Sequence, residues 1–240
     1  MIPVIGVDPA PKNPTTIYDG DTWHTVEAEK LPLCISEMVN GDSVLICWDS
    51  PLTSGQINVA GCFYERPIER FFRQSPAFKA PKGISVLAYA RCPHWVITRV
   101  SLGLPRFTVW ESPAGQLPFE LIAEGSAPKK AGHYVVEVHP AVALWLWCRA
   151  GHEQGPWTYK KQRAVLDKLW KTLQQRVQAY PPNREPNNHD ECDAYIAYLL
   201  GCQWLSSESV ILLGNSQTGS FLLPDIAGLK EDFNRFTDCA

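Results

Sequence analysis

The chain has 240 residues, of which 45% are hydrophobic, and it carries eight cysteines and a formal net charge of −3. This length and apolar content allow one large domain or a domain with an insertion, and they exclude a disordered chain. No apolar run approaches the roughly 20 residues that a membrane-spanning helix needs, so no membrane partner is expected. The cysteines form no CxxC pair and, with no signal peptide, they indicate the buried thiols of a cytoplasmic protein.

In the first part of the chain, strand and helix patterns alternate. Residues 2–8 form an apolar run that predicts a buried strand, and residues 15–29 predict two short strands joined by a tight turn at Gly20. Residues 29–41 have the apolar spacing of a helix, and residues 42–51 predict a second buried strand.

Residues 51–131 interrupt this alternation with a segment rich in Pro, Arg and aromatic residues. Within it, residues 65–74 have the pattern of a short basic amphipathic helix. Its arginines and phenylalanines could contact a single-stranded nucleic acid or could form the core of the segment. We therefore expect residues 51–131 to be an insertion within a single domain of residues 1–240.

The second part of the chain returns to regular patterns. Residues 134–138 predict a third buried strand, and a helix begins after it at Pro140. Residues 158–180 predict a long amphipathic helix and residues 189–206 a second, largely apolar one, before two short strands within residues 209–224. Buried strands that alternate with helices indicate an α/β sheet, whose ligands bind beyond the carboxyl ends of the strands.

Charges are distributed unevenly along this order of elements. Residues 1–64 and 177–240 are acidic, whereas residues 65–106 and 129–176 are rich in Lys and Arg. The asymmetry is consistent with an acidic site beside a basic substrate surface, and equally with ordinary solvated helix faces.

Three of the predicted strands carry an acid at or near their carboxyl end. These acids are Asp8, Asp49 and Glu137, and a turn that contains proline follows each of them. Acidic residues are disfavoured in strands, so a carboxylate at this place needs an explanation. One such acid could form a turn or cap a helix, but that explanation is less satisfactory for three.

More acids open the predicted helix at HDECDAYIAYLLG, residues 189–201. Asn188 suits the N-cap, and Glu191 stands three residues later, which is a capping-box pattern. Asp190 could complement the helix dipole or bind a ligand. Asp193 lies on the apolar stripe of the helix, where a carboxylate is costly unless it is paired or binds a cation.

Five carboxylates brought together would repel one another, and a divalent cation is the usual remedy. The five are Asp8, Asp49, Glu137, Asp190 and Asp193. Ligand sets made of hard oxygen atoms select Mg²⁺ or Mn²⁺, and two such ions can activate a water for phosphodiester hydrolysis. The alternative is that the acids are structural and scattered.

Nearby basic groups provide candidates for further roles. Lys160, Lys161 and Arg163 open the long helix and could hold a substrate phosphate, although a solvated first turn explains them as well. Cations at a helix N-terminus oppose the helix dipole, which favours the phosphate role slightly. His189, and less so His139, could be a general base or a metal ligand, or could be an oriented structural residue.

Five segments, taken in order, resemble the domain of unknown function 429 family, a family of predicted RNase H-like nucleases. The segments are IGVDPAP, ICWDSPL, VVEVHPA, YKKQRAVL and HDECDAYIAYLLG, and the resemblance spans residues 2 to about 223. It implies an RNase H-like mixed sheet flanked by helices, with the first three strands as an antiparallel meander. It also implies that the metal ligands are Asp8, Asp49, Asp190 and Asp193, whereas Glu137 is typical of the family without an assured role.

Together these patterns predict a cytoplasmic, Mg²⁺- or Mn²⁺-dependent nuclease-like hydrolase with nucleic acid as its substrate. An actin-like nucleotide or sugar phosphotransferase is an alternative, but the chain lacks the Gly-rich phosphate turns that this class requires. A non-catalytic module that binds nucleic acid or metal is a second alternative. The sequence leaves open the choice between DNA and RNA and the oligomeric state.

Overall fold

The computed structural model describes residues 2–10, 14–27, 30–39, 41, 43–50, 52, 66–75, 119–148, 158–206 and 209–238. The strands are β1 (Val4–Asp8), β2 (Thr15–Tyr18), β3 (Trp23–Val26), β4 (Val44–Trp48), β5 (Glu120–Ile122), β6 (His133–Glu137), β7 (Val210–Asn215) and β8 (Gly219–Pro224). The helices are α1 (Leu31–Met38), α2 (Pro67–Gln74), α4 (Pro140–Trp147), the 3₁₀ turn η6 (Thr158–Lys160), α5 (Arg163–Arg176), α6 (His189–Leu205) and α7 (Leu229–Asp238).

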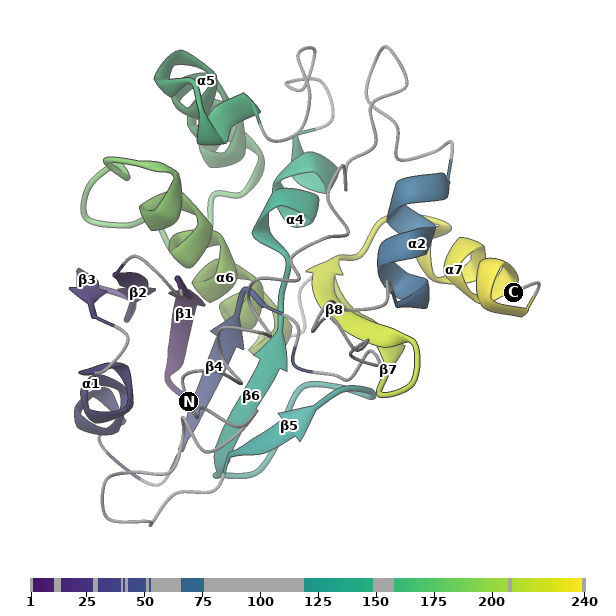
Figure 1. Cartoon of the computed structure of the whole chain (residues 1–240), viewed down its shortest axis with the longest axis horizontal. Coiled ribbons are helices and arrows are strands. Elements are labelled where there is room, and N and C mark those ends of the chain that lie inside the picture. The colour runs from purple at the N-terminus through teal and green to yellow at the C-terminus, as the bar shows by residue number, and fades with distance from the viewer. Residues whose placement is uncertain are drawn as a thin grey trace, which may run out of the picture.

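A six-stranded mixed sheet with helices on both faces forms the centre of the chain (Figure 1). Its strand order is β3-β2-β1-β4-β6-β5. β1, β2 and β3 are an antiparallel meander, whereas β1, β4, β6 and β5 run parallel. The predicted α/β class is therefore confirmed, and the expected meander of the first three strands is present.

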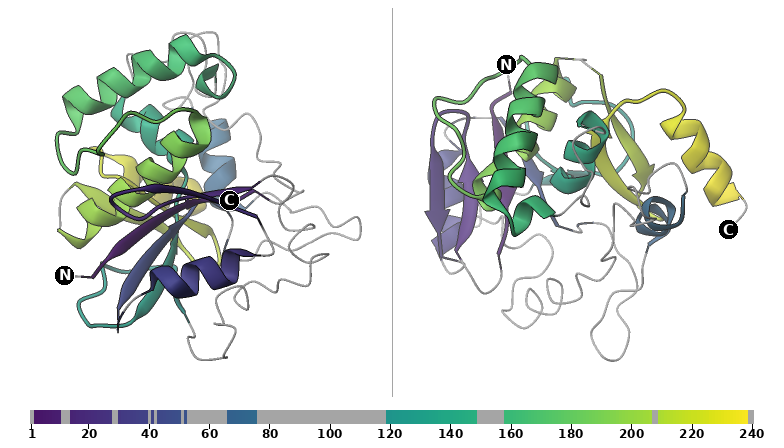
Figure 2. Two further views of the ribbon diagram at one scale, coloured as in Figure 1. Left: turned by 90° about the vertical axis from the view of Figure 1, so that its left-hand side faces the viewer. Right: turned by 90° about the horizontal axis from the view of Figure 1, so that it is seen from above.

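Alternation along the strands divides the core into two layers. Val4, Leu45 and Cys47 point into the larger layer, which also contains the buried face of α6. The neighbouring residues Ile5 and Ile46 point the other way, into a smaller layer that α1 covers. In the left view of Figure 2, α1 lies on one side of the sheet and α6 on the other. A residue's place in this alternation thus decides which helix it meets.

α6 packs directly against the backbone of β1, and glycine makes this approach possible. A Cβ atom at Gly6 would lie 2.0 Å from the carbonyl oxygen of Ala194 and 2.4 Å from the backbone nitrogen of Tyr198. Gly201 has the same effect on β4, since a Cβ atom there would lie 2.5 Å from Cys47 Sγ. The first turns of α6 consequently lie at the carboxyl end of β1.

The described parts of residues 51–131 contribute to the core and to the sheet. α2 lies in the predicted amphipathic segment and packs into the larger core layer, and β5 extends the sheet beside β6. Residues 53–65 and 76–118, which make up most of the segment, lie outside the described residues. Whether residues 51–131 form one insertion therefore stays a prediction.

Several boundaries differ from those expected from the sequence. The single helix predicted over residues 158–180 is a 3₁₀ turn followed by α5, with Gln162 extended between them. β5 and α7 were not predicted, although Leu229 and Phe233 have helical spacing and are buried. No helix in the part of the chain that the structure describes is long and apolar enough to cross a membrane.

Replacing Gly6 by alanine tests the close packing of α6 on β1. We expect Gly6→Ala to lower the free energy of unfolding by about 3 kcal/mol or more, because the clash is with backbone atoms that cannot move aside. The matched control is Gly132→Ala, for which the atoms nearest to the new Cβ atom belong to the end of the Tyr134 side chain and not to the backbone. Urea unfolding measures both, and equal small effects would contradict the proposed constraint.

Candidate active site

Two strand-end acids lie side by side where the parallel strands finish. β1 and β4 pair with Val7 opposite Trp48, so the following residues, Asp8 and Asp49, are neighbours. Alternation places both on the sheet face that α6 covers, the face of Cys47. The predicted meeting of the strand-end acids therefore occurs for these two, and both side chains are partly exposed.

The first turns of α6 bring two more acids to the same edge. Asp193 is fully buried, and Asp190 is close enough to Asp8 to form a hydrogen bond with it. Burial raises the pKa of Asp8 well above its usual value, and the negative charges of Asp193, Asp49 and Asp190 raise it further. We call Asp8, Asp49, Asp190 and Asp193 the carboxylate cluster.

Two residues of η6 contact the buried Asp193. The Tyr159 hydroxyl donates a hydrogen bond of 2.7 Å to Asp193 Oδ1, and Lys160 Nζ forms an ion pair of 2.7 Å with Oδ2. Burial lowers the pKa of Lys160, but the charges of Asp193, Asp8 and Asp49 raise it by more, so the ammonium stays charged. The sequence indicated that Asp193 needs a partner, but nothing in it singled out Tyr159.

The single Lys160 ammonium cannot compensate the charge of four carboxylates, and the pKa of Asp49 remains raised. Burial raises the pKa of Asp49 to about 8; the Lys160 charge opposes this, and the charges of Asp193 and Glu137 add to it. Within the described residues, the Asp49 carboxylate has no hydrogen-bond or ion-pair partner. The cluster therefore holds protons near neutral pH unless another cation joins it.

The donor atoms of the cluster have the chemistry that a hard divalent cation prefers. In the described part of the chain, however, no three acidic, His or Cys side chains are close enough together to share one metal ion. A divalent ion that bound these acids would have to draw their carboxylates closer together. Since both oxygens of Asp193 already have partners, the donors open to a metal are Asp8, Asp49 and Asp190.

Glu137, predicted to be a fifth catalytic acid, lies elsewhere. It pairs in register with Trp48, one residue before Asp49, so alternation points it to the opposite face of the sheet. Arg66 binds it through two contacts, of 2.6 Å from Nη2 to Oε1 and 2.9 Å from Nη1 to Oε2. The Leu52 backbone nitrogen also donates to Oε2, at 2.9 Å. Glu137 thus links Leu52 and Arg66, which are far from β6 in sequence, to the end of β6.

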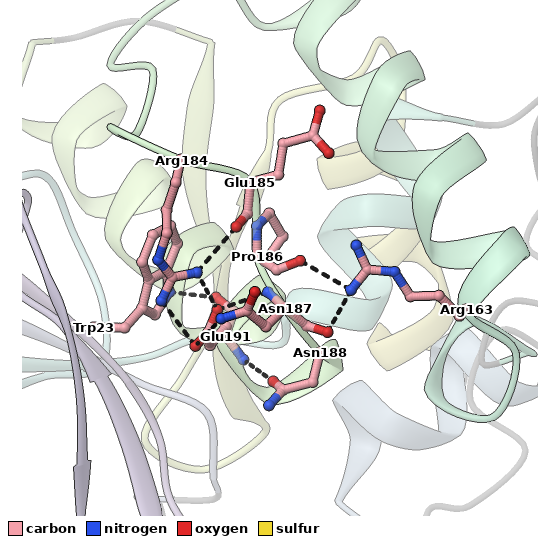
Figure 3. A network of polar contacts seen from close by, with 8 residues as sticks. All are labelled: Trp23, Arg163, Arg184, Glu185, Pro186, Asn187, Asn188 and Glu191. Carbon is pink, nitrogen blue, oxygen red and sulfur yellow. Dashed lines mark hydrogen bonds and ion pairs between the residues drawn. The ribbon is translucent and has the colours of Figure 1, made fainter.

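The three basic residues predicted to bind phosphate have separate positions. Lys160 belongs to the carboxylate cluster through Asp193, and Lys161 is exposed. Arg163 donates hydrogen bonds to the carbonyl oxygens of Pro186, at 3.1 Å, and Asn187 (Figure 3). It therefore holds the loop that precedes α6, and Lys161 is the residue of the three that stays available to a ligand.

A polar network fixes the start of α6 (Figure 3). The predicted N-cap is confirmed, since Asn188 Oδ1 accepts a hydrogen bond of 2.8 Å from the Glu191 nitrogen. The Glu191 carboxylate accepts from the Asn187 nitrogen, at 2.7 Å, and binds both Arg184 terminal nitrogens, at 2.6 and 2.9 Å. The Arg184 guanidinium stacks 4.1 Å from the ring centroid of Trp23 in β3. Glu191 is therefore structural, but its carboxylate accepts from the Asn187 nitrogen and not from the N-cap nitrogen that the capping-box pattern predicted.

The two histidines near the cluster have different environments. His189 Nε2 lies 3.0 Å from Asp190 Oδ1, and this hydrogen bond raises the pKa of His189 and lowers that of Asp190. Burial lowers the pKa of His139 to about 3, helped by the positive charges of Lys160 and Arg66. His139 is thus neutral at physiological pH, whereas His189 is oriented by Asp190 at the rim of the cluster.

Comparison of the chain with protein-family models, with curated proteins and with solved structures found no match in any of the three. The geometry and chemistry of the described residues are therefore the basis for a functional proposal.

The Glu137–Arg66 pair provides a test of its structural role. We expect Glu137→Gln to lower the free energy of unfolding by about 1–3 kcal/mol, because it removes one of the two carboxylates, Glu137 and Glu69, that pair with the buried Arg66 guanidinium. Glu120→Gln, an exposed change on β5, is the control and should have little effect. Denaturant unfolding reports both values. A Glu137→Gln protein of unchanged stability would contradict a structural ion pair.

The raised pKa of Asp49 predicts a pH-dependent gain in stability for Asp49→Asn. Below the unfolded pKa of about 4, Asp49 is protonated in both states; as pH rises toward about 8, the folded protein is penalised for ionising it. With EDTA present, the melting temperature of Asp49→Asn should therefore exceed that of the wild type increasingly from about pH 5 to about pH 9. The exposed change Asp225→Asn should show no such trend, and a constant difference for Asp49→Asn would refute the prediction.

Proposed function

We propose that this chain is a divalent-metal-dependent phosphodiester hydrolase with an RNase H-like fold that acts on nucleic acid. The observation that carries the proposal is the carboxylate cluster, in which two strand ends and one helix bring four acids to one edge of the sheet. The antiparallel meander of the first three strands supports the fold, as does the position of α6 across β1. Both features agree with the family that the sequence resembles.

Each acid of the cluster has a role that its surroundings support. Asp8, Asp49 and Asp190 would hold the cation, since their carboxylates are partly exposed and lie near one another. Mg²⁺ or Mn²⁺, when bound, would supply an activated water and stabilise charge on the leaving oxygen. Asp193 is fully buried and supports the site through Tyr159 and Lys160.

The contacts of the other candidate residues decide which of them could act on the substrate. Lys161 is exposed, follows Lys160 directly and suits a phosphate of the substrate backbone. His189 is kept next to the cluster by Asp190 and is the residue best placed to exchange protons with solvent. Glu137 is left out of the proposed mechanism, because Arg66 and the Leu52 nitrogen occupy its carboxylate.

A cleavage assay with the variant Asp8→Asn tests the proposal. Labelled single-stranded, duplex and branched DNA and RNA are incubated with the protein and Mn²⁺, or with EDTA. We expect cleavage with Mn²⁺ alone and a loss of more than about 100-fold in Asp8→Asn, since even residues that merely support metal ligands contribute up to that much.

Two controls accompany this assay. The exposed change Asp225→Asn should leave cleavage intact, and circular dichroism should show that Asp8→Asn is folded. Failure to cleave any of these substrates with Mn²⁺ would contradict the proposed function. Cleavage that persists in folded Asp8→Asn would place the activity at a different site.

A further inference from the structure

We infer that Lys160 acts as a resident cation of the carboxylate cluster, so that the protein binds one divalent ion where the acids alone would suit two. In this arrangement Asp193 is a positioning residue and is not a metal ligand. The inference rests on the proposed function for the nature of the ion, but its test measures metal binding and not cleavage.

The contacts of Asp193 leave little room for a metal ion. Its side chain is fully buried, the Tyr159 hydroxyl holds Oδ1 at 2.7 Å, and the Lys160 ammonium holds Oδ2 at 2.7 Å. A metal at Asp193 would have to displace the ammonium from its ion pair and leave it without a partner beside a divalent charge. Removing one partner of such a buried pair is strongly unfavourable.

The backbone around Lys160 fixes the ammonium in this place. Tyr159 is 2% exposed and belongs to the larger core layer, so the residue next to Lys160 is anchored by packing. The backbone nitrogens of Lys161 and Gln162 both donate to the Thr158 carbonyl, at 3.0 Å each, and close the turn. Lys160 therefore approaches the cluster from a hydrogen-bonded turn that Tyr159 anchors in the core, although part of its side chain remains exposed.

The other three acids of the cluster, Asp8, Asp49 and Asp190, are the donors that remain for one ion, and they would have to draw closer together to share it. Asp8 and Asp190 are within hydrogen-bonding reach of each other, and Asp49 adjoins Asp8 across the strand pair. All three are partly exposed, so an ion can reach them from solvent. With the ammonium already present, one divalent ion brings the formal charge of the cluster from −3 to −1, and a second would reverse its sign to +1.

Manganese titration of the metal-free protein, followed by calorimetry and by electron paramagnetic resonance, tests this inference. We expect one Mn²⁺ per chain for the wild type and two for Lys160→Met, because the second ion takes the place of the lost ammonium. The matched control is Lys161→Met, which removes an exposed charge one residue away and should keep one ion. Two ions in the wild type, or an unchanged single ion in Lys160→Met, would overturn the inference.

A second pair of variants keeps the test decisive if Lys160→Met fails to fold. Asp49→Asn should lose Mn²⁺ binding, because Asp49 is a proposed ligand. Asp193→Asn should keep one ion per chain, with affinity reduced by no more than the roughly 10–100-fold that loss of a supporting residue costs. Loss of all binding in folded Asp193→Asn would contradict the positioning role.

The outcomes separate the inference from the proposed function. One bound Mn²⁺ without cleavage of any nucleic acid contradicts the function and supports the inference. Metal-dependent cleavage with two bound ions supports the function and contradicts the inference. A wild-type protein that binds no Mn²⁺ contradicts both.

Discussion

The close contact between α6 and β1 is the constraint on which the rest of the site depends. Gly6 has no side chain, so the helix backbone at Ala194 and Tyr198 lies directly on the strand. This contact sets the position of α6 along β1, and with it the distance between the acids of the helix and Asp8. A side chain at residue 6 would lift the helix and separate the two groups that the carboxylate cluster brings together.

Electrostatic balance distinguishes the two buried acidic groups of the sheet. Glu137 meets the Arg66 guanidinium in bidentate geometry, and Arg66 also pairs with Glu69 at the start of α2. The carboxylate cluster has one ammonium for four acids, and the pKa of Asp8 and of Asp49 is raised as a result. Carboxylates with pKa values raised by neighbouring negative charges are typical of functional sites, because a bound cation can compensate the excess negative charge. The same chain therefore uses acids at neighbouring strand ends for structure and for a candidate site.

Much of this arrangement could be predicted from local patterns. Apolar runs located β1, β4 and β6, and the spacing of Asn188 and Glu191 located the start of α6. The burial of Asp193 and its need for a partner followed from the apolar stripe of the helix. The identity of that partner did not, because Tyr159 and Lys160 lie on a separate element and only packing brings them to Asp193. α7 and β5 were missed, the latter because three residues carry too little periodicity.

The sequence by itself determined most of the elements, the helix cap and the three acids that end apolar strands, since these depend on neighbours along the chain. Only the tertiary structure decided which acids meet. Strand register pairs Glu137 with Trp48, and a shift of one residue would have turned it to the face of Asp49. Packing likewise decided that Lys160 faces Asp193 and that Arg163 holds the loop before α6. Contacts between distant segments depend on register and on the approach of backbones, which local residue patterns do not specify.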